Sequence, residues 1–302
     1  MSLQALIPFV LKLSILLNVF AIGLKASVHD ATFMFRRPGK LAKALLAMNI
    51  LMPLFAVAFV LSLHLHHAVE VALVALAVSP VPPILPRKLR KAGATESDAI
   101  GLLVAVGILA IVFVPAAMEI LERVFHVPLR MTFASVAALV FITIILPLAL
   151  GIAVHTLAPV LAEHLVNPIA KIGSIGLLLC AVAILFSSAP AIWELVGNGT
   201  LVAIAAFILG GLLIGHFVGG PKPENRAGLA MATASRHPGI AIALAVTNFP
   251  EQKLAIPAVL LYLLVNAFVS IPYHTWTKRQ AHEIEKEKSS LRSDRVGNKT
   301  TT

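Results

Sequence analysis

The sequence predicts an all-α polytopic membrane protein with nine transmembrane helices, two of which are discontinuous. The chain has 302 residues, of which 59% are hydrophobic and 13% are charged, whereas soluble domains carry about 25% charged residues. Long apolar stretches recur along the chain, each able to cross about 30 Å of hydrocarbon. Two of these stretches contain residues that cannot continue a helix. Together these observations define the fold class.

The nine predicted spans follow one another with short connections, and residues 1–277 form one membrane domain. The first span has no basic leader and no small-residue cleavage site, so we expect it to be retained. Residues 278–302 are strongly polar, which predicts a cytoplasmic tail that begins as a short helix and then loses order. In chain order the spans are Leu3–Lys25, Lys40–Leu63, Ala68–Ala92, Thr95–Glu122, Met131–Thr156, Asn167–Ala189, Leu195–Gly219, Glu224–Asn248 and Gln252–Thr277.

The basic residues predict the orientation of the chain. Most of the 24 lysines and arginines lie in the connections after spans 1, 3, 5 and 7 and in the tail, whereas the other side holds Arg123, Arg130 and Lys253. The positive-inside rule therefore places the N-terminus outside and the C-terminus in the cytoplasm of the plasma (inner) membrane. An even number of spans would disturb this alternation. The net charge of +10 thus reflects membrane topology, and we expect no nucleic-acid partner.

Several classes of chemistry are not expected. The single cysteine, Cys180, lies in an apolar run, which excludes a disulfide framework, a thiolate zinc cluster and an iron–sulfur centre. No Ser/His/Asp, zinc or paired-carboxylate arrangement is readable in the sequence. The chain is therefore not expected to be an enzyme, to have catalytic residues, or to bind a metal or cofactor.

The two interrupted spans are the third and the eighth. The first break begins at Ser79 and the second at Ser235, and each is rich in residues that stop a helix: Pro80, Pro82, Pro83 and Pro86 in the first, Pro238 and Gly239 in the second. Proline removes a backbone donor and clashes with the preceding turn. In lipid, broken backbone is tolerated where it is buried in protein or lines a cavity.

Spans 1–4 and 6–9 have the same order and opposite orientations, and the third span of each set is the broken one. This arrangement predicts inverted repeats whose two discontinuous helices cross at a binding site near the membrane midplane. The alternative is that the prolines only kink two ordinary helices. The sequence leaves both interpretations open.

The second break carries two polar residues with alternative roles. A charge inside the membrane costs about 2.5–3.5 kcal/mol on insertion scales, so Arg236 is expected to face a cavity or a partner. It either binds an anionic substrate or has a structural role, capping freed carbonyls or pairing with a distant acid. His237 offers a route for proton coupling, or it only hydrogen-bonds backbone. The half-helix that follows points its N-terminus at the crossing, where an anion is favoured.

The basic run Arg87-Lys88-Leu89-Arg90-Lys91 directly follows the first break. It is dense enough to contact anionic lipid at the cytoplasmic face. Topology determination explains it equally well, and its position beside the prolines also fits an anion vestibule near the inner gate.

Several motifs in order resemble the bile acid:sodium symporter family. They are Phe20-Ala21-Ile22-Gly23-Leu24, Asp30, Arg36-Arg37-Pro38, Met52-Pro53, Ser79-Pro80, Gly93-Ala94, Thr233–Ala245 and Pro257–Asn266. The resemblance covers most of the chain up to about Thr277 and implies a divergent, bacterial-type member. It implies a core domain and a panel domain, with two discontinuous helices crossing at the core centre. The implied activity is secondary transport of a small or amphipathic organic anion by alternating access.

The same resemblance shows departures at both breaks. In the family, Ser and Asn of a Pro-Gly-Gly-Thr-Ala-Ser-Asn crossover help to hold sodium; the corresponding residues here are Leu85 and Pro86. In the second break the family reads Glu-x-x-x-Gln-Asn-Ser-Gly, and this chain has Ala232 and Arg236 at the Glu and Gln positions. Apolar side chains cannot coordinate a hard cation that requires oxygen. We therefore expect no sodium coupling through the usual sites, and an arginine charge in place of the cation.

The expected substrate-binding residues are Ser79, Ser235, Arg236, His237 and Asn266. Asn266 aligns with a polar residue that faces the family's substrate cavity. One alternative function is oxyanion or metalloid efflux, because the related arsenite carriers share the architecture. Their membrane thiol is replaced by Ser79 here, which disfavours arsenite. A second alternative, from a different class, is a non-transporting membrane receptor or sensor.

Overall fold

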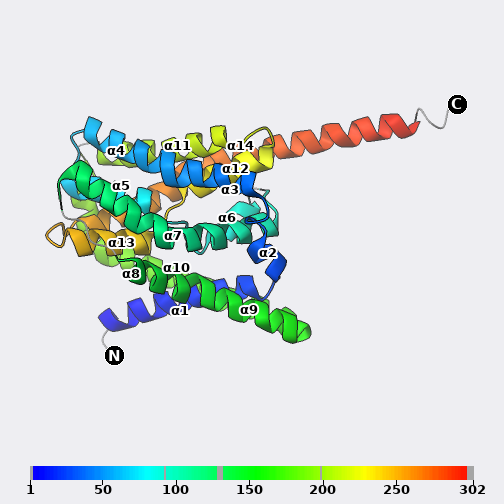
Figure 1. Ribbon diagram of the computed structural model, residues 1–302, viewed down its shortest axis with the longest axis horizontal. Coiled ribbons are helices and arrows are strands. Elements are labelled where there is room, and N and C mark those ends of the chain that lie inside the picture. Colours follow the sequence, from blue (N-terminus) through cyan, green and yellow to red (C-terminus); the bar gives the residue numbers. More distant parts are fainter. Residues whose placement is uncertain (1–2, 92, 128–131, 198, 298–302) are drawn as a thin grey trace.

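The computed structural model describes residues 3–91, 93–127, 132–197 and 199–297, and the regular elements in this part of the chain are helices (Figure 1). Arg130 and residues 298–302 of the predicted tail lie outside the described residues. Within the described residues, eight helices are long and apolar enough to cross a membrane, and the helix His67–Val78 is apolar but shorter. The chain is therefore an integral membrane protein.

The elements follow the order of the predicted spans, with α2 (Val28–Thr32) in the first connection. Their bounds are α1 (Leu3–Gly23), α3–η1–α4 (Pro38–Leu45, Leu46–Leu51 and Met52–Ser62), α5 (His67–Val78), α6 (Leu85–Lys91), α7 (Glu96–Phe125), α8–η2–α9 (Phe133–Val140, Phe141–Ile145 and Leu146–Leu157), α10 (Pro159–Leu195), α11 (Thr200–Val218), α12 (Pro223–Ala234), α13 (Pro238–Asn248) and α14 (Ala255–Gly297). The sixth span is longer at both ends than predicted, so Lys171 lies within α10 and not in the connection before it.

The third predicted span is not a single helix. It consists of α5 and α6, joined by the irregular segment 79–84, so it is not one of the eight long helices. Ser79 is extended because proline disfavours the α conformation of the residue before it. The eighth span is likewise divided into α12 and α13, and Pro238 takes the first helical position of α13. Both predicted breaks are therefore confirmed, whereas the nine transmembrane spans and the inverted-repeat topology remain predictions.

Two of the spans contain a π-helical turn just before a proline, in which each backbone hydrogen bond spans one residue more than in an α-helix. The π-helical turns η1 and η2 precede Pro53 and Pro147, which stand in the first turns of α4 and α9. Proline cannot donate to the turn before it and its ring displaces that turn. Such π-helical turns occur frequently at functional sites, and η1 lies at the site described below.

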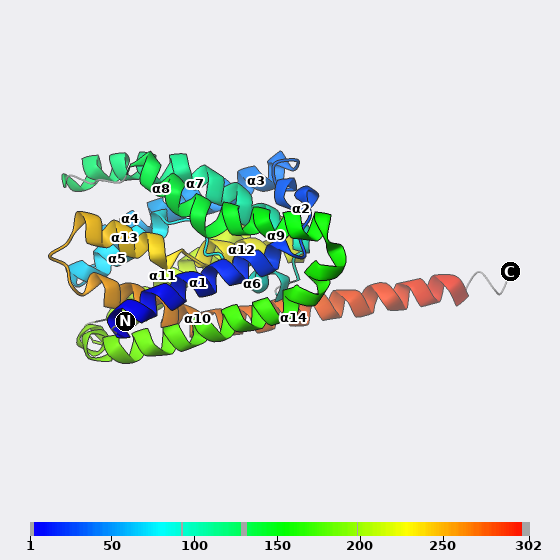
Figure 2. The same ribbon diagram turned by 90° about the horizontal axis from the view of Figure 1, so that it is seen from below.

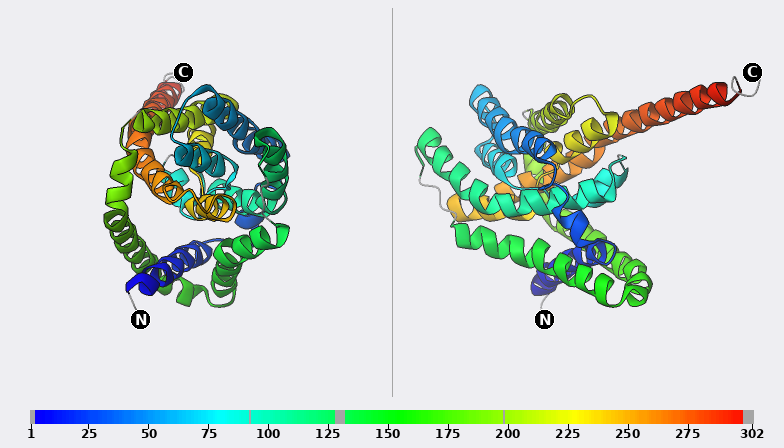
Figure 3. Two further views of the ribbon diagram at one scale, coloured as in Figure 1. Left: turned by 90° about the vertical axis from the view of Figure 1, so that its left-hand side faces the viewer. Right: turned by 45° about the vertical axis from the view of Figure 1, so that its right-hand side comes forward.

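The helices form two groups (Figure 3). We call α1, α8–η2–α9 and α10 the panel group and the remaining helices, α3 to α7 and α11 to α14, the core group. Figure 2 shows α1 running beside α10, and α1 also packs against α9, where Gly23 and Gly151 bring the two backbones together. In the most apolar 18-residue stretch of the α12–α13 span, 72% of the residues are buried, compared with 11% in the corresponding stretch of α10. The broken helix α12–α13 is therefore central and α10 is peripheral.

The short helix α2 ties the connection between the two groups to the start of α7. Ser27 and Asp30 form a capping box, and Ser97 donates a hydrogen bond to the Asp30 carboxylate. Burial raises the pKa of Asp30, but the hydrogen bonds from Ser27 and Ser97 outweigh it and hold this pKa below its usual value. The carboxylate is thus charged, and bound, over the physiological pH range.

The polar tail begins within a helix that continues from the membrane domain. Helix α14 crosses position 277 without interruption and extends beyond the other helices to Gly297 (Figure 1). Residues 278–297 include three each of Glu, Lys and Arg, which favour helix. The helical part of the tail is therefore longer than the sequence reading predicts.

Candidate functional site

The two breaks lie against each other at the centre of the core group. The backbone N–H of His237, in the second break, donates to the carbonyl oxygen of Pro80 at 2.8 Å and is 3.2 Å from the hydroxyl of Ser79. Ser79 itself donates to the carbonyl of Leu76, one turn back in α5. The two interrupted backbones thus satisfy part of each other's hydrogen bonding. We call this region the crossing.

The guanidinium of Arg236 binds two carbonyl oxygens that prolines have left without helical donors. The carbonyl of Ser79 would accept from residue 82 or 83, and both are prolines. In the π-helical turn η1, the N–H of Met52 bonds to Ala47, so the carbonyl of Met48 would accept from residue 53, which is also proline. Arg236 donates through Nη1 to Ser79 at 3.2 Å and through Nη2 to Met48 at 2.9 Å.

This arginine is enclosed in protein. Its exposed fraction is 2%, and its Nε has no hydrogen-bond partner among the described residues. The ion pairs found among the described residues do not include it. A full positive charge is therefore held at the crossing by carbonyl dipoles.

A third carbonyl, that of Ala234, has no helical donor, because the residue four positions later is Pro238, which lacks an N–H. It accepts hydrogen bonds from the hydroxyl of Tyr262 at 2.5 Å and from Nδ2 of Asn266 at 2.7 Å. The Tyr262 hydroxyl also accepts from the backbone N–H of Arg236 at 3.2 Å. Helix α14 thus fixes the position from which Arg236 projects.

His237 caps the second half-helix. Its Nδ1 accepts from the N–H of Ile240 at 3.3 Å, and its Nε2 has no partner among the described residues. A side chain on Gly239 would approach the His237 ring to about 3.2 Å, so glycine leaves room for this cap. Protonation of Nδ1 would remove the acceptor, and the geometry therefore favours a backbone hydrogen-bonding role over proton coupling.

The five predicted substrate-binding residues all lie at the crossing. Ser235, 2% exposed, is 3.4 Å from the ammonium of Lys88, the second residue of the basic run. Of the helix-breaking residues, Pro80, Pro82 and Pro83 lie in segment 79–84, and Pro86 is in the first turn of α6. Sequence reasoning did not identify Met48 and Tyr262. For Met48 the signal was Pro53, which follows an apolar stretch and leaves a carbonyl without a donor. For Tyr262 it was a hydroxyl in an apolar span, because a buried tyrosine hydroxyl needs a hydrogen-bond partner.

Sodium does not fit the crossing as it stands. Leu85 and Pro86, which correspond to the family's sodium ligands, are buried and offer no side-chain oxygen. The carbonyl oxygens of Ser79 and Met48, which a hard cation would use, are occupied by Arg236. Among the described residues there is also no cluster of three or more His, Cys, Asp or Glu side chains that could hold a metal ion.

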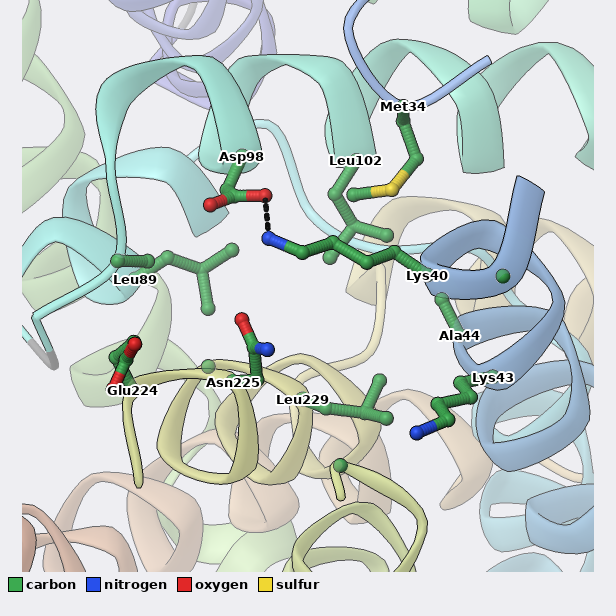
Figure 4. Close-up of a pocket in the computed structure, with 14 residues that line it drawn as sticks. Met34, Lys40, Lys43, Ala44, Leu89, Asp98, Leu102, Glu224, Asn225 and Leu229 are labelled. Carbon is green, nitrogen blue, oxygen red and sulfur yellow. Dashed lines mark hydrogen bonds and ion pairs between the residues drawn. The ribbon is translucent and has the colours of Figure 1, made fainter. Parts of the chain in front are cut away.

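A cavity of about 270 Å³ lies elsewhere in the core group, between α3, α7 and α12 (Figure 4). Lys40 and Asp98 form an ion pair of 2.7 Å across it, and Figure 4 shows Glu224 and Asn225 on the side of α12. Its polar residues come from helix ends that the sequence assigns to the cytoplasmic side. Because it is confined to the core group, it does not separate the two groups of helices.

The fold and the crossing define an integral membrane protein built around two broken helices in mutual contact, an arrangement used by transporters. A family model described as the sodium bile acid symporter family matches residues 12–195. Because this match covers more than half of the chain, the protein belongs to that family and is by class a membrane transporter. The match includes the first break and Met48 and ends before the second break. No curated protein matches the chain.

Proposed function

We propose that this protein is a secondary transporter of an organic anion, acting by alternating access and not coupled to sodium through the family's usual positions. The observation that carries the proposal is the Arg236 guanidinium, bound to the carbonyl oxygens of Ser79 and Met48. In this proposal the arginine side chain supplies the positive charge that a bound metal cation would otherwise supply. The remaining steps concern charge, architecture and substrate.

The charge at the crossing supports an anionic substrate. Arginine stays protonated at all relevant pH values, so the crossing carries positive charge in every step of the cycle. The first turn of α13 adds its partial positive charge, and Gly239 in that turn is exposed. An anion that approaches the crossing at Gly239 is attracted by both the arginine charge and the partial positive charge of the first turn of α13. We assign Ser79, Ser235, His237 and Asn266 to the wall of this site.

The architecture supports alternating access between the panel and core groups. We propose that spans 1–4 and 6–9 are inverted repeats, because each set has its third span broken and the two breaks contact each other. The distribution of basic residues supports an orientation in the plasma membrane with the C-terminus in the cytoplasm. Rocking of one group against the other around a fixed crossing would expose the site to each side in turn.

The metalloid alternative is less well supported. Soft thiolate ligands are the protein groups suited to soft metal centres. The one thiol of the chain, Cys180, lies in α10 of the panel group, 3.7 Å from the carbonyl oxygen of Ile7, and not at the crossing. No described feature favours a receptor.

Transport is tested by uptake into proteoliposomes. Radiolabelled cholate, taurocholate and benzoate serve as amphipathic and small anions. We expect saturable uptake of at least one of them above protein-free vesicles, and a loss of about tenfold or more in Arg236→Gln, since 1.4 kcal/mol of lost interaction already gives tenfold. The matched control is Arg123→Gln, an exposed arginine paired with Glu119. Absence of uptake overturns the proposed activity, and wild-type uptake by Arg236→Gln overturns the role of the charge.

A further inference from the structure

The panel and core groups are linked by a hydrogen-bonded arginine. Arg87, the first basic residue after the first break, lies in α6 of the core group. Its Nη1 donates to the amide oxygen of Asn18 in α1 at 3.1 Å and to the hydroxyl of Ser174 in α10 at 2.6 Å. Both acceptors belong to the panel group. A guanidinium of the core is thus bound to neutral groups of the panel.

These neutral partners are themselves held in place. The Ser174 hydroxyl lies 3.2 Å from the Asn18 amide oxygen and 2.5 Å from the carbonyl of Ala170. Asn18 donates to the carbonyl of Ser14. The acceptors are fixed on α1 and α10, so movement of α6 relative to the panel must break the contacts of Arg87.

A cavity of about 150 Å³ adjoins this contact between the two groups. It carries an excess of positive charge, because Arg90 pairs with Glu96 at 3.1 Å while Lys25 and Arg87 take part in none of the ion pairs found among the described residues. Apolar residues form the rest of its wall, among them Ala21, Ile22 and Val166. The cavity has room for an anionic head group and an apolar surface beside it.

We propose that Arg87 is an anion-recognition residue, which exchanges Asn18 and Ser174 for the carboxylate or sulfonate group of the transported anion. This inference rests on the proposed function. Hydrogen bonds between a guanidinium and an anion are shorter and stronger than bonds to neutral acceptors, so a substrate anion competes effectively for Arg87. Because Arg87 lies in the first turn of α6, directly after the irregular segment 79–84, its change of partner is transmitted to the crossing. Of the three roles open to the basic run, this assigns the anion vestibule to Arg87.

The test measures binding of radiolabelled taurocholate and benzoate to purified protein in phosphatidylcholine nanodiscs. We expect Arg87→Gln to weaken binding by roughly 10- to 100-fold, the effect of losing a hydrogen bond to a charged group. Arg87→Lys, which keeps the charge without the planar fork, is expected to lose less. Arg123→Gln, an exposed arginine of α7, is the matched control.

The variant Ser174→Ala distinguishes anion recognition by Arg87 from a purely structural link between the panel and core groups. Removing this acceptor frees Arg87, so the inference predicts binding that is unchanged or tighter. If Arg87 serves only to join the panel and core groups, Ser174→Ala and Arg87→Gln weaken binding alike, and the inference is wrong. If the wild-type protein binds an anion and Arg87→Gln binds it equally well, the inference fails while the proposed function stands. If the wild-type protein binds neither anion, the inference and the proposed function both fail.

A second arm distinguishes a soluble anion from a lipid head group, which offers similar chemistry. The titrations are repeated in nanodiscs that contain phosphatidylglycerol. We expect the Arg87-dependent binding to persist there with modest competition. Should Arg87→Gln change only the response to phosphatidylglycerol, and not binding in pure phosphatidylcholine, Arg87 is a lipid contact and the inference is overturned.

Discussion

At the scale of single residues, the crossing is explained by prolines that leave carbonyl oxygens without donors and by side chains that supply them. Arg236 serves Ser79 and Met48, while Tyr262 and Asn266 serve Ala234. A buried backbone carbonyl without a donor costs about 1–3 kcal/mol. In lipid, where water cannot replace the donor, these partners are required. The structural and electrostatic roles of Arg236 are therefore two aspects of one arrangement.

This explanation predicts a stability defect that is separate from transport. Arg236→Met removes the charge but keeps a long side chain, so two carbonyls are left unsatisfied and the free energy of unfolding falls by about 2–4 kcal/mol. The measurement is thermal or denaturant unfolding of purified protein in detergent. Arg123→Met, an exposed arginine whose ion pair contributes little, is the control. Equal stability of Arg236→Met and wild type would show that these hydrogen bonds do not matter.

At the scale of elements, the positions of the breaks were predictable and their partners were not. Prolines within an apolar run determine where α5 and α12 end, and this follows from local chemistry. The hydrogen bond between Arg236 and the carbonyl of Met48 was not predictable. It depends on the π-helical turn before Pro53 and on the packing of helices from distant parts of the chain. The helical part of the tail is longer than predicted, because strong polarity was taken to indicate loss of order after a short helix.

The second break gives a test at this scale. Pro238→Ala restores a backbone N–H that can bond to the carbonyl of Ala234, so α12 and α13 can join into one helix. We expect thermal stability to be kept, because proline at the first helical position carries no penalty and the new N–H can replace the donors that Ala234 has now. We expect uptake to be lost, because His237 then leaves Pro80. Pro272→Ala, at an exposed position inside α14, controls for proline removal in general. Full uptake by Pro238→Ala would contradict a functional break.

At the scale of the whole molecule, a member of the sodium bile acid symporter family holds a protein charge where its two broken helices meet. The panel and core groups are joined by the neutral contacts of Arg87, and the core centre holds the guanidinium of Arg236 where relatives are expected to place sodium. A fixed charge does not leave with the substrate. The proposed transport therefore does not depend on a sodium ion bound by the carbonyl oxygens of Ser79 and Met48, which Arg236 contacts.

The most direct test of this account is uptake of the transported anion with sodium replaced by potassium on both sides of the proteoliposome membrane, at constant ionic strength and pH. The account predicts the same initial rate in both salts, and the same melting temperature of the purified protein in sodium and potassium chloride. A rate that depends steeply on sodium, together with a sodium-specific rise in melting temperature, would show that a cation site remains and would contradict replacement of that site by Arg236.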